Sequence, residues 1–254
     1  MRTRAQGILI RFTLREFLAQ RVLVVLFILY LVFLLSLPLW KHFSPETEAG
    51  FLADFALGLF GFFLLLVTLL LTSDLLPGDL EKGRTVFFCS HPLGKWDYLL
   101  GRALGTWLFL GLTAFLLALA LKGFFLYEQW PFSLKPVPFV FLKYLVLSSF
   151  LILISLIVER FSCIFFGLSF FLISNSLGTL SFFAQESGNP VLRGWMKLAA
   201  VLLPHFELFD LGSQPALGGA SLLAVYFSKA ALYAFGFTGI YFLLAFLILR
   251  RRTL

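Results

Sequence analysis

Apolar residues along the chain fall into six runs long enough to cross a lipid bilayer. A spanning helix needs about 20 mostly apolar residues to cover about 30 Å of hydrocarbon. Polar and charged residues are concentrated between these runs and at their ends. The pattern therefore predicts six transmembrane helices, over residues 22–40, 55–73, 103–121, 139–158, 161–183 and 230–249.

The segment before the first run has a different periodicity. Arg11 and Arg15 recur at helical spacing on one side, and Phe12 and Phe17 supply apolar area on another. A helix with one polar and one apolar face lies in the membrane interface rather than across it. We therefore predict an N-terminal interfacial helix within residues 1–21.

Residues 74–101 form a polar stretch between the second and third runs. Within it, a semi-apolar run follows Gly83 and ends at Pro92, which cannot continue a helix. This pattern predicts a short amphipathic helix lying along the membrane, then a turn into the next span. Such a helix offers a rigid contact to a soluble partner, whereas the simpler alternative is an ordinary solvated loop.

Residues 184–228, before the last run, contain an apolar stretch that is too short to cross. It covers 191–203 and ends at Pro204. A re-entrant or surface-lying helix fits this length. His205, Glu207 and Asp210 are then expected to return the chain to water.

Composition excludes a water-soluble domain. Hydrophobic residues make up 60% of the 254 residues, charged residues make up 13%, and the mean hydropathy is +0.97. Soluble domains carry about 25% charged residues. The chain is therefore predicted to be an all-α membrane protein with a single transmembrane domain over residues 1–254.

The charges indicate an orientation rather than a nucleic-acid partner. The net charge is +7, but the basic residues lie at the ends of apolar runs and form no stripe that follows phosphates. Lysine and arginine are more frequent on the side that holds both termini in a six-span topology, and Arg250 to Arg252 follow the last run. The positive-inside rule therefore predicts that both termini are cytoplasmic and that 184–228 is extracytoplasmic.

No constellation along the chain predicts catalysis. Cys89 and His91 are too few ligands for a metal site, and no Asp/Glu/His relay, HExxH motif or Walker A motif is present. We expect no cofactor in this chain and no enzyme activity of its own. A polar cluster in the fifth run, Ser174, Asn175 and Ser176, either lines a pathway or makes interhelical hydrogen bonds.

The polar stretch carries a resemblance to a known family. Glu81-x-Gly83, Pro92 nine residues later, Lys95, and Gly101-Arg102 opening the third span resemble the type-2 permeases of ATP-binding-cassette (ABC) exporters. The segments LLPHFELFDL (202–211) and ILRRRTL (248–254) are also similar to that family, and the amphipathic start resembles its elbow helix. Arg84 departs from the pattern, because the family usually has threonine there.

The resemblance implies a transmembrane permease subunit in the cytoplasmic membrane of a prokaryote. Two six-helix halves, identical or different, would each dock on a separate ATP-binding subunit that holds ATP and magnesium. The segment around 79–92 would be the coupling helix, and the residues implied to meet the ATPase are Asp79, Glu81, Gly83, Arg84, His91, Pro92 and Lys95.

Two other functions stay open on the sequence. One is a haem-exporter-type permease of cytochrome c maturation, which belongs to the same class with a different cargo. The other is a non-transporting membrane scaffold or assembly factor. The 34 phenylalanines suit an apolar or amphipathic cargo, but contact with lipid explains them equally well.

Overall fold

The computed structural model describes residues 2–39, 48–81, 94–128, 133–186, 190–210 and 220–251, and these residues are helical with short connections. The elements, in chain order, are α1 (Arg2–Leu18), α2 (Arg21–Ser36), α3 (Glu48–Glu81), α5 (Lys95–Tyr127), α6 (Val137–Ser155), α7 (Arg160–Asn175), α8 (Leu177–Glu186), α9 (Pro190–Leu202), the 3-10 helix η2 (Phe206–Phe209) and α10 (Ala220–Arg251).

Five helices of the described chain are long and apolar enough to cross a membrane: α2, α3, α5, α6 and α10. A sixth candidate is the pair α7 and α8, whose axes are bent by 56°. The architecture is that of a multi-pass membrane protein. The described residues therefore contain five candidate spans, or six if the bent pair crosses as one.

The prediction of one continuous helix over 161–183 is wrong, because α7 ends at Asn175 and α8 begins at Leu177. The break falls within the polar sequence around Ser176, whose backbone leaves the helical region. Serine and asparagine side chains compete with the backbone for hydrogen bonds, which weakens a helix interior. The Asn175 side chain is bound to a different helix, as described below.

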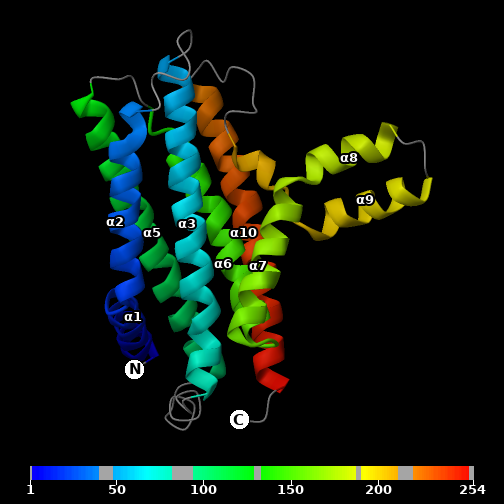
Figure 1. Ribbon diagram of the computed structural model, residues 1–254. Helices are drawn as coiled ribbons and strands as arrows, with labels where there is room; N and C mark the ends of the chain where they lie inside the picture. Colours follow the sequence, from blue (N-terminus) through cyan, green and yellow to red (C-terminus); the bar gives the residue numbers. More distant parts are fainter. Residues whose placement is uncertain are drawn as a thin grey trace.

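Helices α2, α3, α5, α6, α7 and α10 form a bundle, and α1 lies at the end of the bundle that also holds both termini (Figure 1). Helix α6 lies at the centre and packs against α3, α5, α7 and α10. Helices α8 and α9 pack against each other and project sideways from the bundle (Figure 1).

Two long helices extend into residues 74–101, the polar stretch between the second and third predicted spans. Helix α3 continues to Glu81, and α5 begins at Lys95. The predicted amphipathic helix between them falls on residues 82–93, which lie outside the described residues. Helix α1 confirms a helix at the start of the chain, whereas its position at a membrane interface stays a prediction.

Candidate functional site

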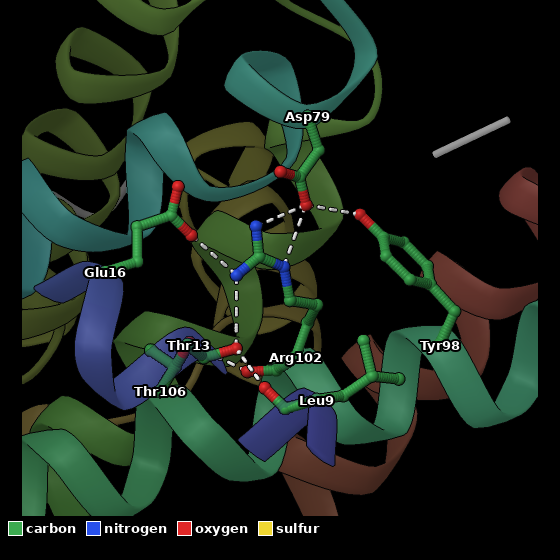
Figure 2. Close-up of polar contacts among 7 residues, drawn as sticks. All are labelled: Leu9, Thr13, Glu16, Asp79, Tyr98, Arg102 and Thr106. Atoms are coloured by element: carbon green, nitrogen blue, oxygen red, sulfur yellow. Dashed lines mark hydrogen bonds and ion pairs between the residues drawn. The ribbon is translucent and has the colours of Figure 1, made fainter. Parts of the chain in front are cut away.

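Arg102 is the centre of a buried polar cluster where α1, α3 and α5 meet (Figure 2). Its side chain is 1% exposed. The guanidinium donates from Nε to Asp79 Oδ2 at 2.8 Å and from Nη2 to the same oxygen. Its Nη1 donates to Glu16 Oε2 at 2.8 Å and to Thr13 Oγ1 at 3.1 Å. One arginine therefore joins three helices, and we call this group the Arg102 cluster.

Tyr98 completes the cluster from the same face of α5. It lies one helical turn before Arg102, and its hydroxyl donates to Asp79 Oδ2 at 2.6 Å. The ring of Phe12 lies 5.2 Å from the guanidinium carbon. A charge removed from water is costly unless it is paired and hydrogen-bonded. Asp79 Oδ2, near the end of α3, supplies this pairing because it accepts hydrogen bonds from both Arg102 and Tyr98.

Two glycines on α5 allow α1 to come this close. A Cβ atom on Gly101 would lie 2.9 Å from Leu9 Cβ, and one on Gly105 would lie 2.7 Å from Thr13 Cβ. The two glycines are four residues apart and therefore share one helix face. Small residues at this spacing let two helices approach closely in membrane proteins. The same contact holds Thr13 within hydrogen-bond distance of Arg102.

A second buried charge lies toward the opposite end of the bundle. Lys143 on α6 is 6% exposed. Its Nζ donates to Asn175 Oδ1 at 2.6 Å and to the two carboxylate oxygens of Asp210 at 3.2 and 3.3 Å. The rings of Phe171 and Phe206 lie 5.3 and 5.8 Å from Nζ. This ammonium group is therefore paired and surrounded by aromatic side chains.

A cavity of about 390 Å³ opens beside Lys143, between α3, α6, α7 and the segment after η2. We call it the Lys143 cavity. Most of its wall is apolar, with charges at Lys143, Asp54 and Asp210. The lining residues are Asp54, Leu57, Gly58, Gly61, Phe62, Leu65, Pro136, Val140, Lys143, Tyr144, Phe171, Asn175, Phe209 and Asp210.

The segment 205–210 is tied to the rest of the protein. Glu207 Oε1 accepts a hydrogen bond from the Gly178 N–H at 3.0 Å, in the first turn of α8, and the His205 N–H donates to Tyr233 Oη at 2.9 Å. A carboxylate at this position satisfies a backbone donor that a helix start otherwise leaves without a partner. Together with the contact of Asp210 to Lys143, these bonds attach the segment to the bundle, whereas its predicted return to water stays a prediction.

Comparison of the sequence with known protein families finds no matching family model, and no curated protein matches it. The resemblance to ABC permeases therefore stays an expectation.

The residues predicted to meet an ATPase are placed as follows. Asp79 is 1% exposed and is bound by Arg102 and Tyr98, and its part in an ATPase contact stays a prediction. Glu81 ends α3, and Lys95 begins α5. The other four, Gly83, Arg84, His91 and Pro92, lie outside the described residues.

The three residues of the polar cluster 174–176, named as possible pathway lining, face different surroundings. Asn175 lines the Lys143 cavity, Ser174 is fully buried, and Ser176 is exposed at the bend. The sequence analysis did not single out Lys143. The signal was present, because a lysine within the apolar run 139–158 is the kind of intramembrane charge that marks a site.

Proposed function

We propose that this chain is the transmembrane permease subunit of an ABC exporter. It would move an apolar or amphipathic substrate across the cytoplasmic membrane with ATP hydrolysed by a separate subunit. The observation that carries the proposal is the Arg102 cluster. It joins the end of α3 to the start of α5, and these are the two helix ends between which residues 82–93 run.

This connection offers a route for mechanical coupling. A displacement applied to residues 82–93 would act on Asp79 at one side and on Tyr98 at the other, and these two side chains are joined because the Tyr98 hydroxyl donates to Asp79 Oδ2. Arg102 extends the connection to Glu16 on α1. The ends of α1, α3 and α5 would therefore move as one unit when an ATPase changes shape. Rigid elements of this kind transmit a change at a partner into a rearranged bundle.

The proposed orientation places the Arg102 cluster in the cytoplasmic half. Both termini lie at that end of the bundle (Figure 1). Arg11 and Arg15 are on α1 at this end, and Arg250 and Arg251 occupy the last turn of α10. Basic residues flanking spans favour the cytoplasmic side. This distribution supports an ATPase approaching from the same end as the cluster.

The test uses the full-length tagged chain purified from its own host membranes in mild detergent. We expect an ATP-binding subunit to co-purify, and we expect ATP hydrolysis by the complex to exceed that of the isolated subunit. Glu81→Lys reverses a charge at the end of α3 and should lower the recovered subunit about fivefold, the effect of about 1 kcal/mol. Glu128→Lys, after the other end of α5, is the matched control.

Two results would oppose the proposal. One is a purified, folded chain that carries no ATP-binding subunit, which favours the membrane scaffold instead. The other is an equal recovery of the subunit with Glu81→Lys and Glu128→Lys, since the ATPase would then not approach the end that holds the Arg102 cluster.

A further inference from the structure

The Lys143 cavity has the size and wall chemistry of a small-molecule site. Its volume of about 390 Å³ falls within the range of about 300–1,000 Å³ found for ligand pockets. Such pockets are mostly apolar with a few polar groups that fix orientation. The cavity lies along the first half of α3, from Asp54 to Leu65, and is therefore separate from the Arg102 cluster at the other end of that helix.

The positive charge in the cavity wall is already neutralised by the protein. Lys143 Nζ donates to Asn175 and to both carboxylate oxygens of Asp210. The aromatic rings of Phe171 and Phe206 lie against the same ammonium group. An anionic ligand would have to compete with Asp210 for this lysine. The geometry therefore disfavours an anion as occupant.

The charge that remains belongs to Asp54 on the α3 wall. The lining holds one positive and two negative side chains, so its net charge at neutral pH is −1. Because Asp210 is bound to Lys143, the carboxylate left for a ligand is that of Asp54. The aromatic side chains of Phe62, Phe171 and Phe209 also line the cavity. Aromatic faces attract cations in addition to apolar groups.

Two glycines on α3 leave the space open. A Cβ atom at Gly58 would have no heavy atom within 4 Å, and one at Gly61 would make an ordinary contact with Tyr144 Oη at 3.5 Å. The Tyr144 hydroxyl donates to the Gly61 carbonyl at 2.6 Å, so this polar group is satisfied without a ligand. The wall at Gly58 therefore has room for a larger side chain.

We infer that the Lys143 cavity is a binding site for an apolar cation, a molecule with one positive charge on a body of aromatic or aliphatic groups. The cation would lie toward Asp54, and the apolar body would contact the walls that α3, α6 and α7 supply. The site goes beyond the proposed exporter function and stands without it, since binding at this site requires neither ATP nor a partner subunit.

The test is direct binding to the purified full-length chain in nanodiscs of phosphatidylcholine, which has no net charge. The probes are tetraphenylphosphonium and tetraphenylborate, which have nearly the same size and shape but opposite charges. Binding is measured by equilibrium dialysis, and empty nanodiscs give the background from lipid. We expect saturable binding of tetraphenylphosphonium and no saturable binding of tetraphenylborate.

Two variants locate the site. Asp54→Asn removes the charge of an exposed side chain and should weaken tetraphenylphosphonium binding about five- to tenfold, as expected for loss of one partly screened ionic contact. Its control is Glu128→Gln, an acid outside the lining. Gly58→Leu fills the cavity and should abolish saturable binding. Its control is Gly123→Leu, because a Cβ atom there also has nothing within 4 Å but the residue lies on α5, away from the cavity.

The inference is overturned if the two probes bind alike, or if none of the cavity variants changes the affinity for tetraphenylphosphonium relative to its control. Each variant is first shown to elute as one species and to melt at the temperature of the unsubstituted chain. A loss of binding in Gly58→Leu is then read as a filled cavity and not as an unfolded bundle.

Discussion

Gly105 on α5 faces Thr13 on α1 so closely that a methyl group at position 105 would lie 2.7 Å from Thr13 Cβ. Gly105→Ala should therefore force α1 away from α5 and reduce stability by about 1–3 kcal/mol, the usual cost of overpacking. Chemical denaturation in detergent measures this loss. Gly123→Ala on the same helix meets no neighbour and should be neutral or slightly stabilising. Equal stability of the two variants would show that the contact is not tight.

The ion pair of Arg102 and Asp79 leads to a prediction about paired substitutions. Arg102→Met leaves the Asp79 carboxylate buried without its guanidinium, which should cost about 3–5 kcal/mol. The double variant Arg102→Met/Asp79→Leu removes both charges and should recover most of that loss, because an apolar pair replaces a buried ionic one. Thermal unfolding of the single and double variants decides the point. A double variant as unstable as Arg102→Met would contradict it.

The proposed topology is tested by labelling introduced cysteines. In a chain whose own cysteines are replaced, single substitutions at Thr3, Glu48, Glu128 and Thr253 are exposed to an impermeant thiol reagent on intact cells. With both termini cytoplasmic, labelling should reach Glu48→Cys and Glu128→Cys only. Labelling of Thr253→Cys would exclude the proposed orientation, and without labelling of Thr3→Cys it would require an odd number of spans.

Helix α9 exposes an apolar face that suits a contact between two copies. Val191, Trp195, Leu198 and Leu202 recur at helical spacing, and Trp195 is 65% exposed. If this helix caps an exit between two permease halves, Trp195→Cys should form an oxidative cross-link between copies in the native membrane. Lys197→Cys, on another face, is the control.

A cross-link at both positions, or at neither, would instead indicate a surface helix that rests on lipid. Locking α9 with the Trp195→Cys cross-link should also stop transport if the helix is part of a gate. Unchanged transport would remove the gating role.

Apolar run length was sufficient to locate the long helices, because about 20 residues must span the hydrocarbon whatever their partners are. Helices α3, α5 and α10 each contain a predicted run, and α2 and α6 each cover most of one but end before its predicted end. The break at Ser176 was not predicted, since it depends on the contacts that Asn175 makes with Lys143 and that Glu207 makes with Gly178. Contacts of residues distant in sequence leave no periodicity along the chain.

The candidate site was predictable only in part for the same reason. Gly101-Arg102 was recognised as the start of a span, but nothing in the sequence placed Glu16 and Asp79 on the same guanidinium. Glu16 and Asp79 lie 86 and 23 positions from Arg102, and residues that far apart cannot be paired by spacing or composition. The Lys143 cavity likewise requires the positions of α3, α6 and α7 at once.

Three residues of one short segment set the direction in which the α8–α9 hairpin extends from the bundle. Glu207 binds the start of α8, and Asp210, three positions later, binds Lys143 at the cavity. Phe209 between them is fully buried. The segment is therefore fixed at both ends, because Glu207 is bound to α8 and Asp210 is bound to α6. A tilt of the α8–α9 hairpin would therefore act on the ion pair of Asp210 and Lys143 through a connection of only three residues.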